Sequence, residues 1–123
     1  MFILRKIEGG RINVFEPQIL TVGNTAVTSG QALVLSSGKL VKCGATTKPT
    51  FIALADGAVG ADIPVGRVET NQIYDVAAVA PGAVVGTKYQ LNSTADGIAT
   101  NATENGVAEV VAVGSDFVTV RFA

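Results

Sequence analysis

The sequence predicts an all-β fold with very little helix. Val, Ile and Thr are frequent and are interrupted by Gly, Asn, Asp and Ser, which is typical of short strands joined by turns. No long window has the apolar spacing and the caps of an amphipathic helix, and only 77–85 and 101–105 leave room for a short helical turn. We therefore expect a small β-barrel, a β-tulip-like arrangement or a sandwich of short antiparallel strands.

Residues 1–25 are predicted to form an amino-terminal arm and an extended connection. Phe2–Glu8 has the apolar content of a first strand, and Arg11–Phe15 alternates apolar and polar residues as a second strand does. Pro17 is expected to end this second strand, because proline has no N–H for a ladder hydrogen bond. Gln18–Gly30, rich in Thr, Gly, Asn and Ser, is expected to be the connection.

Residues 26–123 are predicted to form a single β domain. Its clearest unit is a hairpin of Ala32–Leu35 and Lys39–Cys43, joined by Ser36-Ser37-Gly38, in which the glycine supplies a positive φ. Phe51–Ala55 is wholly apolar and is expected to be buried on both sides or at an interface. The remaining strands are expected at Ile63–Glu69, Ile73–Val79, Lys88–Asn92, Gly97–Thr100, Val107–Val113 and Phe117–Phe122.

Two stretches of this domain, 30–68 and 86–122, resemble each other and indicate a twofold internal repeat. Both begin with a glycine, followed by a strand, a turn containing serine, and a second strand. Near their ends, Asp62–Val68 resembles Asp116–Phe122, and each segment carries a single arginine. Small barrels and sandwiches are commonly assembled from such repeated strand units.

The composition excludes several classes of chemistry. The chain of 123 residues contains no His and one Cys, so it has no imidazole base, no His-metal site and no internal disulfide. Cys43 is therefore predicted to be a small buried apolar residue rather than a nucleophile. Asp56, Asp62 and Asp96 lie among glycines and are predicted to be turn residues rather than Ca²⁺ ligands. We expect no enzymatic activity, no metal and no cofactor.

The charge distribution bears on partners. A net charge of −1 does not indicate nucleic-acid binding, which is typical of basic surfaces. No run approaches the ~20 apolar residues of a membrane-spanning helix. We therefore expect neither nucleic acid nor membrane as a partner. Residues 1–48 hold six basic and two acidic residues, and 49–123 hold three basic and eight acidic ones. This asymmetry arises by chance or belongs to a molecule that docks with its basic end first.

The amino-terminal arm is the candidate interface. An apolar triplet, Phe2-Ile3-Leu4, precedes Arg5-Lys6, although chain ends usually fray unless something holds them. Such a β-prone end is either an ordinary first strand of its own sheet or a strand added to the sheet edge of a neighbour. The residues that would contact a capsid or a neighbouring subunit are Phe2, Ile3, Leu4, Arg5, Lys6, Ile12, Val14 and Phe15.

Three blocks of the sequence resemble a known family. Ala26–Lys42, Phe51–Asp56 and Ile63–Val68 are similar to the capsid decoration (cement) proteins of tailed phages, in particular the lambda-type head decoration proteins. The resemblance covers about residues 26–122. It implies a small barrel-like or tulip-like β domain that sits as a homotrimer on the outer surface of the virion capsid. It also implies an arm, here Met1–Phe15, that pairs with the major capsid protein, although lambda-type arms are richer in Ala, Thr and Pro.

Two functional hypotheses follow. A structural decoration protein stabilises the capsid lattice and needs only contact area and shape, which suits a chain with low charge and many small side chains. The alternative is a non-enzymatic receptor- or glycan-binding module of a head or tail fibre. That function would need an exposed aromatic or Asn/Asp-rich patch, for which Asn92–Asn105 is the candidate loop.

Overall fold

Two antiparallel sheets make up the protein. The computed structural model describes all residues except 8–16, 70, 78–81 and 103–105, and omits the side chains of 6, 7 and 100–102. The five-stranded sheet contains β2 (Pro17–Thr21), β3 (Ala32–Ser36), β4 (Lys39–Lys42), β5 (Phe51–Ala53) and β6 (Asp62–Arg67). The six-stranded sheet contains β1 (Ile3–Ile7), β7 (Gln72–Ala77), β8 (Lys88–Leu91), β9 (Ile98–Ala102), β10 (Ala108–Val113) and β11 (Phe117–Phe122).

The all-β prediction is confirmed, and the described residues contain no helix, so none of them forms a helix that could cross a membrane. Neither sheet is closed into a barrel. The five-stranded sheet is nevertheless strongly curled, because the Gly23 N–H donates to the Leu40 carbonyl at 2.8 Å just beyond the end of β2. This bond brings the end of β2 beside β4 without a continuous ladder between them.

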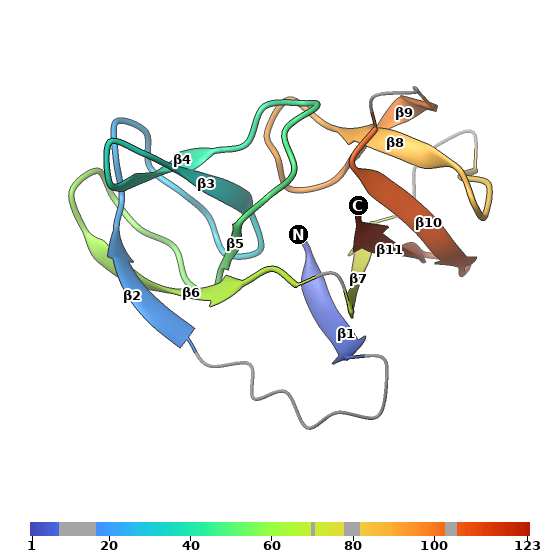
Figure 1. Cartoon of the computed structure of the whole chain (residues 1–123), viewed down its shortest axis with the longest axis horizontal. Helices are drawn as coiled ribbons and strands as arrows, with labels where there is room; N and C mark the ends of the chain where they lie inside the picture. Colours follow the sequence, from blue (N-terminus) through green and yellow to red (C-terminus); the bar gives the residue numbers. More distant parts are fainter. Residues whose placement is uncertain (8–16, 70, 78–81, 103–105) are drawn as a thin grey trace.

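The amino-terminal strand lies between the two halves of the molecule. Figure 1 shows β2–β6 on one side, β7–β11 on the other, and β1 running between them. In the sheet ladder β1 pairs with β7, so the first strand completes a sheet that is otherwise built from the carboxyl-terminal half. Residues 1–25 thus contribute β1 to one sheet and β2 to the other.

The strand order is the same in both sheets. The five-stranded sheet has the order β2-β6-β5-β3-β4, and the six-stranded sheet has the order β7-β11-β10-β8-β9 with β1 added beside β7. Each strand of the first half therefore has a counterpart five strands later. The repeat indicated by 30–68 and 86–122 corresponds to β3–β6 and β8–β11, and the structure extends it to β2 and β7.

Hydrogen bonds outside the ladders recur in the same way in both halves. The Gly30 N–H donates to the Ala53 carbonyl at 2.7 Å, and the Gly86 N–H donates to the Val110 carbonyl at 2.8 Å. Likewise, the Thr50 N–H donates to the Leu33 carbonyl at 3.0 Å, as the Val107 N–H does to that of Tyr89 at 3.0 Å. At the end of each half, the Val68 N–H donates to the Thr50 carbonyl and the Ala123 N–H to the Val107 carbonyl, both at 2.9 Å. The two halves are thus equivalent in backbone detail as well as in strand order.

The register of the last strand differs from the one that the sequence suggests. Matching Asp62–Val68 with Asp116–Phe122 would make Arg67 and Arg121 equivalent. In the ladders, however, Arg67 lies opposite Phe51 and Phe122 lies opposite Ala108, so that Arg67 corresponds to Phe122. A slip of one residue moves every side chain of a strand to the other face, and similarity between alternating strands does not detect it.

Two clusters of buried residues form the hydrophobic core of the protein. The inner core lies within the curl of the five-stranded sheet and consists of Val22, Val27, Leu33, Leu40, Phe51, Ala53, Ile63 and Val65. The shared core joins the halves: Ala32, Cys43 and Ile52 from the first half pack with residues of the six-stranded sheet such as Phe122. Because successive residues of a strand point to opposite faces, β3 and β5 contribute to both cores.

The burial of β5 on both faces confirms the expectation for the start of Phe51–Ala55, since all three residues of the strand are buried. The hairpin is also confirmed: β3 and β4 pair across a turn in which Gly38 has a φ of 77°. The expectation that Gln18–Gly30 is an extended connection is wrong at its start, because residues 18–21 belong to β2, which begins at Pro17. Proline is tolerated as the first residue of an outer strand. The predicted strand Arg11–Phe15 lies outside the described residues.

Candidate partner interface

The predicted interface residues of β1 divide between the core and the surface. Phe2 is only 2% exposed, and its ring packs edge-to-face on that of Phe122 with 5.1 Å between the centroids. Leu4 is half-buried against the same shared core, whereas Ile3 between them is 56% exposed. Alternate positions of the strand therefore anchor it and face outward, as the period of a strand requires.

The chain end is held by both halves of the molecule. The Phe2 N–H donates to the carbonyl of Gly30, at 2.8 Å, just before β3. The terminal amine of Met1 donates to the carbonyl of Asp96, in the loop between β8 and β9. In this arrangement β1 is an ordinary first strand of its own sheet, and Phe2 presents no surface to a neighbour.

Arg5 fixes β1 to its neighbour from the outer face. Its guanidinium donates to both carboxylate oxygens of Asp75 on β7, at 3.0 and 3.1 Å, and lies 5.4 Å from the centre of the Phe117 ring. The Thr119 hydroxyl donates to the same carboxylate at 2.8 Å. Three strands, β1, β7 and β11, are thereby linked by one group of side chains. The Arg5 side chain thus links strands within its own sheet, and its charge is paired with that of Asp75.

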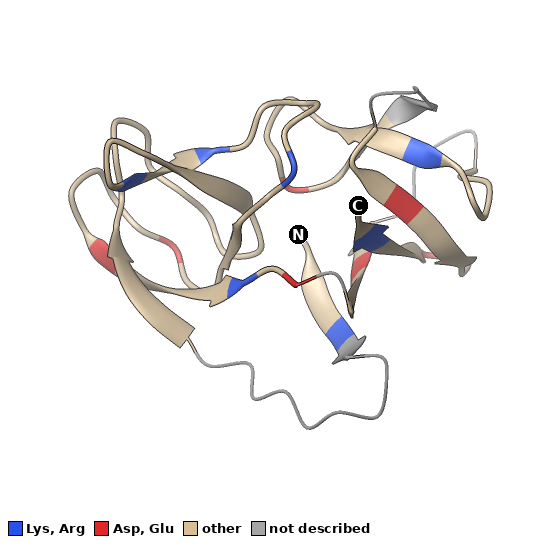
Figure 2. Ribbon diagram, in the orientation of Figure 1, with Lys and Arg blue, Asp and Glu red and all other residues tan. Residues whose placement is uncertain are grey.

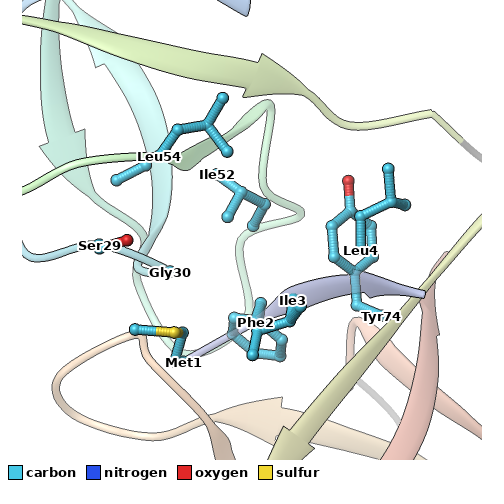
Figure 3. Close-up of a pocket in the computed structure, with 10 residues that line it drawn as sticks. Met1, Phe2, Ile3, Leu4, Ser29, Gly30, Ile52, Leu54 and Tyr74 are labelled. Carbon is cyan, nitrogen blue, oxygen red and sulfur yellow. The ribbon is translucent and has the colours of Figure 1, made fainter. Parts of the chain in front are cut away.

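An apolar hollow of about 170 Å³ lies beside β1, where the two halves meet. We call it the β1 hollow. Figure 3 shows Ile52 and Leu54 on one side of it and the first residues of the chain on the other. The exposed apolar side chains of Met1, Ile3 and Leu54, at 51%, 56% and 39%, lie along it. Phe2, Ile3 and Leu4, predicted as interface residues, all line this hollow.

Leu54 was not named among the candidate interface residues, although the run Phe51–Ala55 was expected to be buried on both sides or at an interface. It follows β5 directly in the run Phe51–Ala55, and its position in that run indicates burial as readily as exposure. Only the packing of β1 against the end of β5 places Leu54 beside the β1 hollow. Among the other candidates, the Lys6 side chain and Ile12, Val14 and Phe15 lie outside the described residues.

The charged residues are spread over both halves (Figure 2). On the first half Lys39 and Lys42 lie on β4, and the Lys42 ammonium donates to the Ser93 carbonyl of the second half at 2.8 Å. Acidic residues accompany them: Asp62 accepts a hydrogen bond from the Thr21 hydroxyl at 2.6 Å, and Asp56 accepts one from the Ser29 N–H at 2.7 Å. Both aspartates therefore stabilise turns and strand ends.

In the segment 92–96, which is the described start of the loop proposed for glycan binding, the polar side chains hydrogen-bond to one another. The Asp96 carboxylate accepts from the Thr94 hydroxyl at 2.6 Å and from the Asn92 amide at 3.0 Å. These bonds, the Thr94 hydroxyl first, lower the pKa of Asp96 below its usual range. Phe117 is half-buried and the other aromatic rings among the described residues are buried, so the described surface offers no exposed ring for a sugar.

The groups that could carry chemistry are few. Within the described ranges, no three His, Cys, Asp or Glu side chains gather where they could hold a metal ion. Cys43 is 2% exposed in the shared core, and burial raises the pKa of its thiol to about 12. It is therefore protonated at neutral pH and behaves as the small apolar residue that the sequence predicts.

Comparisons of the chain with protein-family models, with curated proteins and with solved structures returned no match.

Proposed function

We propose that this chain is a capsid decoration protein that binds the outer surface of a tailed-phage head and stabilises the capsid lattice without catalysis. The observation that carries the proposal is the β1 hollow, an apolar depression bordered by exposed Met1, Ile3 and Leu54. Apolar side chains left in water around a hollow mark a surface that a partner covers. The sequence resemblance supplies the kind of partner, the major capsid protein, and the homotrimeric arrangement.

The position of the hollow suits a lattice clamp. It lies where the two halves meet, and the chain end beside it is bonded to both of them through Gly30 and Asp96. A side chain of the capsid protein that entered the hollow would touch β1, β5 and β7 together, because Ile3, Ile52 and Tyr74 all line it. Covering Ile3 and Leu54 would contribute roughly 25 cal/mol for each Å² of apolar surface removed from water.

Binding to heads tests the proposal. Heads of a tailed phage that encodes this chain, assembled and expanded without it, are mixed with the purified protein, and bound protein is measured against concentration. We expect saturable binding that Ile3→Asp and Leu54→Asp each weaken at least about tenfold, since a buried charge is costly. Val85→Asp, at a similarly exposed apolar residue outside the hollow, is the control.

Absence of binding by the unaltered protein, or equal binding by all three variants, would overturn the proposal. The mass of the purified protein, measured by light scattering alone and on heads, tests the trimer separately. Heads that carry the protein are also expected to withstand heating better than bare heads, because bound protein stabilises the state to which it binds.

A further inference from the structure

Leu54, beside the β1 hollow, begins a row of residues that project from the outer face of the five-stranded sheet. The Leu54 N–H donates to the Pro64 carbonyl at 3.0 Å, and Pro64 lies directly opposite Ile19 of β2 in the ladder. Their neighbours in the sequence pack in or against the inner core, namely Ala53, Ile63, Val65 and Leu20. Because successive residues of a strand point to opposite faces, Leu54, Pro64 and Ile19 project together away from that core. We call these three residues the outer row.

The outer row continues the apolar surface of the β1 hollow across three strands. Leu54 lines the hollow and is 39% exposed, Pro64 is half-buried, and Ile19 is 65% exposed. Adjacent strands lie about 4.8 Å apart, so Ile19 lies roughly 10 Å from Leu54. In Figure 1 the row follows β5, β6 and β2, away from β1. The hollow of about 170 Å³ has room for about one side chain, and the outer row supplies part of the further area that a stable interface needs.

The Leu54 carbonyl is an unpaired acceptor within this surface. In an antiparallel pair whose residues bond to each other, each residue donates its N–H to the carbonyl of the other. Leu54 donates to Pro64, but proline has no N–H with which to return the bond. Among the described residues no other group donates to the Leu54 carbonyl. A carbonyl that is buried without a donor costs free energy, so a partner that covers Leu54 has to supply one.

The strands of the outer row carry one acidic charge on this face and no basic one. β2 and β5 contain no charged residue. On β6, Asp62 is two positions from Pro64 and shares its face, whereas Arg67 belongs to the opposite face and pairs with Glu69 at 3.6 Å. Asp62 accepts a hydrogen bond from the Thr21 hydroxyl but makes no ion pair with any described residue. A carboxylate without an ion pair and a free carbonyl suit a partner that brings cationic donors.

We propose that the capsid contact extends from the β1 hollow along the outer row to Ile19, and that it receives an apolar segment of the major capsid protein that carries a lysine or arginine. The extended contact rests on the proposed function and names the part of the partner that this surface recognises. Apolar side chains of the segment cover Leu54 and Ile19. Its cationic side chain donates to the Asp62 carboxylate, and a further donor of the segment reaches the Leu54 carbonyl.

Binding to expanded heads tests how far the contact extends. Ile19→Asp should weaken binding at least about tenfold, because it buries a charge, and Ile19→Ala should weaken it by a smaller factor. Ile19 is mostly exposed, so both variants should fold, which far-ultraviolet circular dichroism and urea unfolding check. Leu35→Asp, at an exposed residue two positions from Leu33 and so on the other face of the sheet, is the control and should bind like the unaltered protein.

The outcomes separate this contact from the proposed function. Weakened binding by Ile3→Asp together with unchanged binding by Ile19→Asp would overturn the extension and leave the proposed function standing. Equal weakening by Ile19→Asp and Leu35→Asp would also overturn it. If the unaltered protein does not bind heads, the proposed function fails and the extension fails with it.

Two substitutions test the chemistry of the segment. Pro64→Val supplies an N–H that can donate to the Leu54 carbonyl, so it should leave stability unchanged or higher but weaken head binding about threefold to tenfold. Asp62→Asn keeps an acceptor for the Thr21 hydroxyl and removes the charge, so binding should weaken and depend less on salt concentration. Unchanged binding by Pro64→Val, or an unchanged salt dependence in Asp62→Asn, would contradict a cationic donor in the segment.

Thiol labelling gives a readout that does not depend on affinity. Ile19→Cys and Leu35→Cys each place an exposed thiol on a protein whose own Cys43 is buried. On saturated heads, labelling of Ile19→Cys should slow at least about tenfold relative to the free protein, because a covered thiol is inaccessible. Leu35→Cys should label at the same rate in both states, and mass spectrometry of the labelled peptides separates both from capsid thiols. Equal rates for Ile19→Cys on and off heads would overturn the proposal.

Discussion

Gly30 and Gly86 occupy equivalent positions in the two halves of the molecule but have different surroundings. Each has a positive φ, 81° and 86°, and each N–H donates to a carbonyl of the middle strand, at Ala53 and Val110. A Cβ added at Gly86 would meet no atom within 4 Å, whereas one added at Gly30 would lie 2.9 Å from the Cα of Met1. The two sites therefore share a backbone conformation, but the amino-terminal residue Met1 packs beside Gly30 only.

Alanine at these two glycines should therefore have unequal effects. Gly86→Ala meets only the left-handed backbone and is expected to lower the free energy of unfolding by about 1 kcal/mol. Gly30→Ala also displaces Met1, and we expect a loss of about 2 kcal/mol or more. Urea unfolding measures both values, and cleavage by an aminopeptidase reports whether the chain end is released. Equal losses would show that Met1 does not hold its place against Gly30.

Replacing Asp75 is expected to destabilise the protein more than replacing Arg5, with which it pairs. Arg5→Ala removes an exposed ion pair and a ring contact, and should lower the free energy of unfolding by about 1 kcal/mol or less. Asp75→Ala also leaves the buried Thr119 hydroxyl without its acceptor, which costs about 1–3 kcal/mol more. Thermal or urea unfolding of the two variants checks this order. In the double variant Asp75→Ala/Thr119→Val, the additional loss caused by the unpaired Thr119 hydroxyl should largely disappear.

Phe2 and Ile3 offer a test of how β1 is anchored. Phe2→Ala empties a buried site against Phe122 and should destabilise the protein by about 3–5 kcal/mol. Ile3→Ala, at a mostly exposed neighbour, should change stability by less than about 0.5 kcal/mol. Chemical unfolding distinguishes the two cases. Similar small effects for both would mean that β1 is not held through its aromatic residue.

The pH dependence of the Asp96 loop has a definite sign. The Thr94 hydroxyl, followed by other hydrogen bonds, lowers the pKa of Asp96 in the folded protein. The carboxylate therefore contributes stability above the unfolded pKa of about 3.9, and that contribution is lost as pH falls through the lower folded pKa. Thr94→Val should raise the folded pKa toward the usual value in a carboxyl NMR titration. Ser93→Ala, at the preceding residue, should not move it.

Cys43 should react only when the protein unfolds. It is buried, and the raised pKa of its thiol leaves almost no thiolate at neutral pH. We expect a thiol reagent such as dithionitrobenzoate to modify it at the rate of unfolding in native buffer and at once in denaturant. Leu35→Cys adds an exposed thiol that should react immediately and serves as the positive control. Rapid labelling of the unaltered native protein would show that the shared core opens at this site.

Local features of the sequence were enough for the fold class. Alternation, β-branched residues and turn residues act on neighbouring positions, so the β3–β4 hairpin and the two-sided burial of β5 could be predicted from Ser37-Gly38 and from the apolar run at Phe51. The apolar triplet at residues 2–4 was likewise recognised as an end that something must hold. It could not be assigned to a partner or to its own sheet, because either surface would bury the same side chains.

The sequence by itself determined that this chain forms short strands, lacks imidazole chemistry and repeats a strand unit, since these properties depend on residue types and near neighbours. Tertiary structure decided that β1 joins β7 rather than β2, that Arg67 corresponds to Phe122, and that Ile3 and Leu54 meet beside one hollow. The physical reason is that these relationships join residues far apart in the chain, where two alternating strands of similar composition accept more than one partner and register.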